Sequence, residues 1–313
     1  MLGGSMDNKP IIRIGYINIA DHLILGVTER KVLKNEEIFK YLHLKTVPFI
    51  DWQTLSLAFS RDEINAAFML APLAMDHFRK GEDLRLVLLG HRNGSVLITN
   101  KSANIKTIQD LKGKDILIPF HLSTHNILLH KLLKDHNLEI GIGKDVEVQT
   151  VAPSKMPTYV EIDTQGKIGG FLVAEPFGSN VIKAGLGDEF ELSKNIWPGH
   201  PCCVLVVKTD IIRYFPNAVQ ELTNSLVKSG RFITENTEEA ARIGVFFLNQ
   251  DINVVRNILT SPADRITTDH LMPQIKDFEQ IQNYIVNVTG NIYEKIDLNK
   301  FIYTGFASQA GAT

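Results

Sequence analysis

Ile11-Ile-Arg-Ile-Gly-Tyr-Ile17 is the stretch that decides the fold class. Its β-branched residues, bounded by Pro10 and Asn18, predict a strand, and Asp21 is placed to cap the helix that follows. The same order of strand and helix recurs along the chain. Such alternation predicts a mostly parallel sheet with helices on both faces, so we expect an α/β protein.

Further strands follow in the first two thirds of the chain, and the last third is mostly helix. Pro48 lies inside the second strand and predicts that this strand is at a sheet edge. The strand count is too large for one small sheet, so we expect two α/β lobes. The further predicted strands are 44–50, 66–70, 84–90, 95–99, 115–119, 146–151, 169–174, 190–193 and 202–208.

Composition narrows the class of protein. The chain has 313 residues, a net charge of −2 and a pI near 6.6, whereas nucleic-acid binding needs a basic surface. The densest apolar run, 84–90, is far shorter than the roughly 20 residues that span a membrane. The two cysteines, Cys202 and Cys203, are adjacent, which gives neither a disulfide framework nor a CxxC metal motif.

Polar residues gather after the predicted strands, where ligands bind in open α/β sheets. The segment Ser123-Thr-His-Asn126 starts a helix, so it predicts capping by Ser or Thr and, as a further function, binding of a small oxyanion by the free N–H groups. The candidate ligand-binding residues are Asn18, His22, Trp52, Ala71, His91, Asn93, Ser123, Thr124, His125, Asn126, Glu175 and His200.

A metal site is an alternative interpretation of the same loops, because imidazole and thiolate together suit zinc or a similar ion. Structural hydrogen bonding and core packing are the competing roles for these residues. Alternation along a strand points Cys202 and Cys203 to opposite faces, so we expect only Cys202 to reach a ligand. The candidate metal ligands are His22, His121, His125, His200 and Cys202.

Six motifs occur together and in order between about Ile12 and Val288. They are Ala67-Phe-Met-Leu-Ala-Pro72, His91-Arg-Asn-Gly94, Leu122-Ser-Thr-His-Asn126, Ala174-Glu-Pro-Phe177, His200-Pro-Cys-Cys-Val-Leu205 and Phe215-Pro-Asn-Ala-Val-Gln220. As a set, they resemble the nitrate/sulfonate/taurine-type substrate-binding proteins of bacterial ABC importers.

The resemblance implies the two-lobed type II periplasmic-binding-protein fold, in which each lobe is a mixed, mostly parallel sheet with flanking helices. A ligand cleft would lie between the lobes. Residues 11–100 and 204–313 would form the first lobe and residues 101–203 the second, with crossings near Lys101 and near His200 to Cys203. We expect residues 1–10 to be a tag remnant and a disordered start.

The resemblance also implies a function: capture of a small oxyanion or sulfonate and its delivery to an ABC permease and ATPase. The protein would be a monomer, either in the periplasm or lipid-anchored on the outer face of the membrane, with its signal segment absent from this chain. No enzyme activity and no required cofactor are expected, and no nucleic-acid partner. The alternatives are a metal-ion or metal-chelate binding protein, with zinc or another divalent metal, and thirdly an enzyme similar to thiamine pyrimidine synthases.

Overall fold

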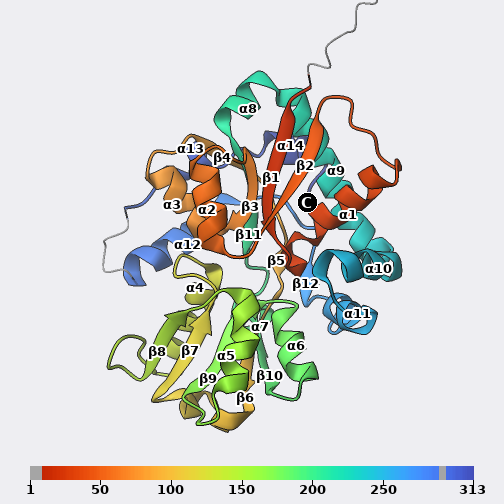
Figure 1. The fold of residues 1–313 in the computed structure, drawn as a ribbon. Coiled ribbons are helices and arrows are strands. Elements are labelled where there is room, and N and C mark those ends of the chain that lie inside the picture. The colour runs from red at the N-terminus through yellow and green to blue at the C-terminus, as the bar shows by residue number, and fades with distance from the viewer. Residues whose placement is uncertain (1–8, 289–293) are drawn as a thin grey trace, which may run out of the picture.

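The structure is a computed structural model that describes residues 9–288 and 294–313. Two five-stranded sheets lie one above the other in Figure 1, and the two-stranded ribbon of β5 (Arg92–Asn93) and β12 (Ile266–Thr267) lies between them. We call each sheet with its helices a lobe. Of the predicted tag remnant, residues 1–8 lie outside the described residues.

The first sheet has the strand order β2-β1-β3-β11-β4. β1 pairs in parallel with β2 and β3, whereas β11 runs antiparallel to β3 and β4. Pro48 lies in β2, which is an edge strand of this sheet, as predicted. The strands of this sheet are β1 (Ile11–Ile17), β2 (His43–Phe49), β3 (Ala66–Leu70), β4 (Leu84–Leu89) and β11 (Cys203–Lys208).

The second sheet has the strand order β10-β6-β9-β7-β8. This order includes β6 (Ser95–Asn100), so the chain first crosses to the second sheet before Ser95. The expectation that it crosses near Lys101 is therefore wrong, because β6 was expected in the first lobe. Sequence pattern shows that 84–90 and 95–99 are both strands, but only their hydrogen-bonded partners show that they belong to different sheets. The strands are β6 (Ser95–Asn100), β7 (Lys114–Ile118), β8 (Val146–Thr150), β9 (Ile168–Ala174) and β10 (Gly187–Leu192).

Helices from both ends of the chain cover the first sheet, and α1 packs on α9 and α10. With these sheet memberships we propose lobe boundaries near Gly94 and near Pro201. The first lobe has α1 (Leu23–Leu33), α2 (Trp52–Ser60), α3 (Ala71–Arg79), α8 (Thr209–Tyr214), α9 (Pro216–Glu235), α10 (Thr237–Leu248), α11 (Ile252–Thr260), α12 (Ile275–Val288), α13 (Leu298–Phe301) and α14 (Gly305–Gln309). The second lobe has α4 (Thr124–Asp135), α5 (Met156–Ile162), α6 (Phe177–Lys183) and α7 (Ser193–Ile196).

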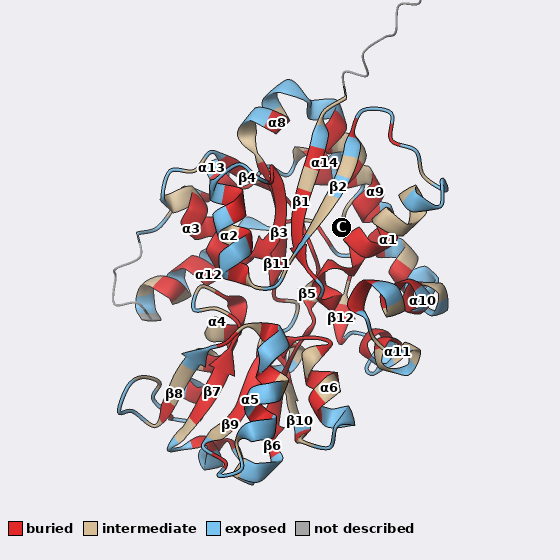
Figure 2. Cartoon of the chain, in the orientation of Figure 1, coloured by how far each residue is buried: buried red, intermediate tan, exposed pale blue. Residues whose placement is uncertain are grey.

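Both lobes contain buried apolar residues, and the red segments of Figure 2 mark the buried residues of each lobe. In the second sheet, the neighbours Val96 and Leu97 belong to different clusters, because successive side chains of a strand point to opposite faces. Helices therefore cover both faces. Within the described ranges, every helix is too short or too polar to cross a bilayer.

Candidate metal-binding site

Three strand ends of the first sheet meet at one edge. β1 leads into the short 3-10 helix η1 (Ala20–His22), which holds Asp21, and β4 leads to His91. β11 runs antiparallel to β4, so its start lies where β4 ends, and Gly90 N donates to Cys203 O at 2.8 Å. This arrangement brings together residues that are far apart in the sequence.

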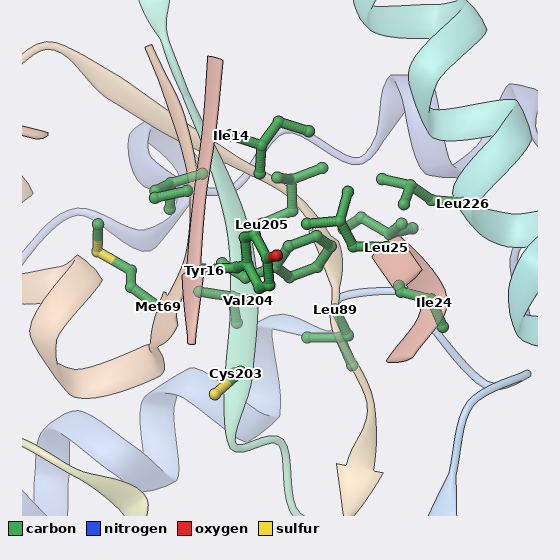
Figure 3. Packing of buried hydrophobic residues seen from close by; sticks show 14 of the residues in the cluster. Ile14, Tyr16, Ile24, Leu25, Met69, Leu89, Cys203, Val204, Leu205 and Leu226 are labelled. Atoms are coloured by element: carbon green, nitrogen blue, oxygen red, sulfur yellow. The ribbon is translucent and has the colours of Figure 1, made fainter. Parts of the chain in front are cut away.

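Asp21, His91, Cys202 and Cys203 form what we call the buried donor group. One ligand atom from each lies within 4.8 Å of those of the others, and all four residues are buried. His91 Nε2 is 2.9 Å from Asp21 Oδ2. Figure 3 shows the Cys203 sulfur at the start of β11, below the apolar residues around Leu205.

Charge is unevenly distributed in the buried donor group. Burial lowers the pKa of His91, but the Asp21 carboxylate outweighs burial and raises this pKa to about 10. The hydrogen bond from the Cys203 thiol lowers the pKa of Cys202 despite burial, with His125 and His91 adding to the effect. Burial raises the pKa of Cys203. These shifts favour a thiolate at Cys202, a carboxylate at Asp21 and an imidazolium at His91.

Two atoms of the group face a space that a side chain would fill. Asp21 Oδ1 and His91 Nδ1 are buried and have no hydrogen-bond partner within residues 9–288 and 294–313. Both lie 3.0 Å from the point where a Cβ on Gly94 would stand, and Gly94 has a φ of 91°. Glycine tolerates this backbone conformation and leaves the room beside both atoms open.

Three further buried histidines surround the group: His22, His125 and His200. One ring nitrogen of each is held, by Ile17 O at 2.8 Å, Ser95 Oγ at 2.9 Å and Trp197 O at 2.7 Å respectively. The other ring nitrogen is buried and has no partner in the described part of the chain. Metal-ligating histidines have this pattern, because the bonded nitrogen fixes the tautomer and the ring orientation.

The protonation of these rings also suits metal binding. Burial lowers the pKa of His22 to about 4 and that of His200 to about 3. Both rings are therefore neutral at neutral pH. In both His22 and His200, Nδ1 carries the proton and donates it to a backbone carbonyl. Nε2 therefore keeps the lone pair that a metal ion needs.

Other predicted ligand-binding residues pack around this centre. Trp52 is buried and meets the His22 ring edge-on at 5.9 Å. Ala71 N donates to Cys202 O at 2.8 Å. Asn93 joins the two segments that connect the sheets, because its Oδ1 accepts a hydrogen bond from Gly199 N at 2.9 Å. Trp52 Nε1 is buried without a hydrogen-bond partner in the described residues, so the ligand-binding role of these residues stays a prediction.

The predicted helix start at Ser123 forms, and several of its side-chain groups bond to protein atoms, whereas Asn126 Oδ1 and His125 Nδ1 have no partner in the described residues. Ser123 Oγ accepts from Asn126 N at 3.1 Å, which confirms the cap. Thr124 Oγ1 donates to Pro201 O at 3.2 Å. Asn126 Nδ2 donates to His121 O at 2.9 Å.

Two predicted residues lie away from the buried donor group. Asn18 is exposed and its amide donates to Phe247 O at 2.8 Å. His121 is exposed and stacks on Phe120, and the charged groups that act on it are Asp76 and Lys80.

Glu175 lies at the seam between the lobes. Its Oε1 is 3.2 Å from Arg265 Nη1, and both side chains are buried. Ser179 donates to both carboxylate oxygens, and Arg265 also pairs with Glu189. Arg265 precedes β12, whereas both carboxylates belong to the second lobe, so this ion pair joins the lobes.

Two expectations from sequence are wrong. Asp21 does not cap α1, whose N-cap is His22 without a side-chain bond, because the Asp21 carboxylate pairs with His91. Cys203 lies in the same donor group as Cys202, because Cys202 precedes β11 and strand alternation does not govern it. The position of Asp21 at a strand end was the available signal for its role.

The chain is similar in sequence to proteins named for nitrate import and for nitrate/nitrite binding. The chain is 26% identical over 243 residues to the nitrate import ATP-binding protein NrtC of Synechocystis, covering 73% of this chain and 36% of that protein. It is 26% identical over 145 residues to the nitrate/nitrite binding protein NrtA of Nostoc, covering 46% of this chain and 32% of the relative. The chain thus spans about a third of the length of these curated relatives.

Solved structures share the fold at low identity. A zinc-bound ligand-binding component of an ABC-type import system from Staphylococcus aureus has a TM-score of 0.84 at 24% identity, covering 96% of this chain and 99% of its own. The nitrate-binding protein NrtA from Synechocystis has a TM-score of 0.84 at 15% identity, with coverages of 97% and 89%. The alkanesulfonate-binding protein SsuA from Xanthomonas axonopodis, bound to MOPS, has a TM-score of 0.77 at 14% identity. The match covers 94% of this chain and 98% of that chain.

These likenesses confirm the two-lobed periplasmic-binding-protein fold that the motifs implied. Residues 5–245 match the profile of the NMT1-like family, and this chain belongs to that family.

Proposed function

We propose that this chain is the extracytoplasmic substrate-binding component of an ABC importer and that its cargo is a transition-metal cation of the zinc type. The observation that carries the proposal is the buried donor group of Asp21, His91, Cys202 and Cys203. Carboxylate, imidazole and thiolate are the three ligand types that bind Zn²⁺ in proteins.

If these side chains only packed in the core, their burial would destabilise the folded protein. An unpaired polar atom in the interior raises the free energy of the folded state, and Asp21 Oδ1 and His91 Nδ1 are two such atoms within the described residues. A cation between them would satisfy both. The zinc-bound Staphylococcus aureus relative of the same fold supports this class of cargo.

The site is binding rather than catalytic in this proposal. The ion would enter when the lobes separate and would be released to a membrane permease driven by an ATPase. Relatives named as components of nitrate and bicarbonate importers support these partners.

Metal analysis of the purified protein tests the proposal directly. We expect about one equivalent of zinc after purification without added metal, and tight rebinding of Zn²⁺ to chelator-stripped protein in competition with a chromophoric chelator. Sodium nitrate and sodium bicarbonate are the comparison ligands in calorimetry. Absence of Zn²⁺ binding together with saturable binding of either anion would contradict a metal cargo.

Zinc affinity is expected to rise with pH between about 6 and 8. The Asp21 carboxylate raises the pKa of His91 to about 10, so Zn²⁺ must displace a proton from His91 throughout this range. Each proton released makes binding about tenfold stronger per pH unit. Competition titrations at pH 6, 7 and 8 measure the slope, and a flat profile would argue against His91 as a ligand.

A small oxyanion is the second candidate cargo, and the helix start at Thr124 favours it, because free N–H groups there attract anions. The Thr124 hydroxyl, however, already donates to Pro201 O. We therefore expect Thr124→Ala to lower the free energy of unfolding by about 1 kcal/mol and to leave Zn²⁺ affinity unchanged. Chemical denaturation and calorimetry measure the two quantities. Loss of nitrate or sulfonate binding in this variant would support the oxyanion instead.

A further inference from the structure

The buried donor group belongs to one side of the seam between the lobes. Asp21 follows β1, His91 follows β4, and Cys202 and Cys203 stand at the start of β11, all in the first sheet. A cation could therefore bind to this group while the lobes are apart.

His125 approaches the group from the other side. It lies in the first turn of α4, whose Leu128, Leu129 and Leu133 pack in the core of the second lobe. Thr124, its neighbour at the start of α4, donates to the carbonyl of Pro201 at 3.2 Å, and Pro201 directly precedes Cys202, so this end of α4 lies against the donor group.

The His125 ring is oriented for a ligand. Its Nε2 is bonded to Ser95 Oγ at 2.9 Å, and Ser95 belongs to β6 of the same lobe. The ring is 1% exposed, and its Nδ1 has no hydrogen-bond partner in the parts of the chain that the structure describes. A second-lobe hydroxyl thus holds the ring while its free nitrogen is buried at the seam.

We propose that the first lobe binds the cation by itself and that His125 Nδ1 is the ligand through which the second lobe closes on it. This inference rests on the proposed metal cargo. Closure without the ion leaves His125 Nδ1, Asp21 Oδ1 and His91 Nδ1 buried without partners, which is unfavourable. The ion bonds His125 Nδ1 in the closed arrangement only, so its binding shifts the population towards closure.

The test separates binding from closure in chelator-stripped protein. Zn²⁺ competition titration measures affinity, and small-angle scattering with and without Zn²⁺ measures compaction. In the wild type we expect binding with a smaller radius of gyration. His125→Ala should still bind Zn²⁺, about 10- to 100-fold more weakly, without compaction. His136→Ala, at the other end of α4, is the matched control, because its ring bonds to Leu132 O within the helix, and it should behave as the wild type.

Cobalt supplies a readout that a folding defect does not imitate. With Co²⁺ as the probe, His125→Ala and the milder His125→Gln should keep the thiolate-to-metal charge-transfer band and shift the d–d bands. Compaction of both His125 variants as in the wild type, or unchanged d–d bands, would overturn the role of His125. Failure of the wild type to bind Zn²⁺ or Co²⁺ would instead overturn the metal cargo itself.

Discussion

Cys202→Ser is expected to lower the affinity for Zn²⁺ by about 100-fold or more, since a hydroxyl is a far weaker zinc ligand than a thiolate. The neighbouring Cys203 thiol and the histidines lower the pKa of Cys202, which favours the thiolate form that binds Zn²⁺. The two side chains are similar in size, and the free energy of unfolding of the metal-free protein should change little. Chelator competition at pH 7.5 measures the affinity.

Cys203→Ser is the matched control for this substitution. Burial raises the pKa of the Cys203 thiol, whose sulfur lies 3.8 Å from Asp21 Oδ2. A serine hydroxyl can donate the same hydrogen bonds, so Zn²⁺ affinity should fall much less than in Cys202→Ser. Equal losses in the two variants would show that both sulfurs ligate the metal, and unchanged affinity in both would remove the thiolate from the site.

Arg265→Ala is expected to lower the free energy of unfolding by about 3–5 kcal/mol, because removing one partner leaves a buried charge uncompensated. Arg265 is 3% exposed and joins Glu175 and Glu189 across the seam between the lobes. Chemical denaturation of the metal-free protein measures the loss. Lys194→Ala, which breaks a pair with the exposed Asp264, is the control and should cost less than about 1 kcal/mol.

The loss in Arg265→Ala should shrink as the pH falls. Burial raises the pKa of Glu175 above the usual value of 4.5, although Arg265 opposes the rise. Ionised Glu175 therefore destabilises the fold once Arg265 is gone, and this cost disappears when the carboxyl is protonated in the folded protein. The double variant Arg265→Met, Glu175→Gln should recover most of the stability at pH 7. Equal losses at pH 5 and pH 8 would contradict this account.

Local sequence patterns determined the elements of this protein. β1 and β3 have the predicted bounds, Pro48 lies in an edge strand, and Ser123 caps α4. These features depend on neighbouring residues, namely β-branched runs, a missing N–H and a short hydroxyl side chain. The strand-end rule also selected His91 and His125, and the fold brings His91 next to the candidate metal ligand Cys202.

Only the tertiary structure decided which candidates meet and what they do there. The antiparallel entry of β11 beside β4 brings Cys202 and Cys203 to His91, and pairing with His91 removes Asp21 from its expected cap. Hydrogen-bonded partners placed β6 in the second sheet, and the seam joined Arg265 to Glu175. Each of these contacts links residues far apart in the chain, so it depends on strand order and register, which a local pattern of side chains does not encode.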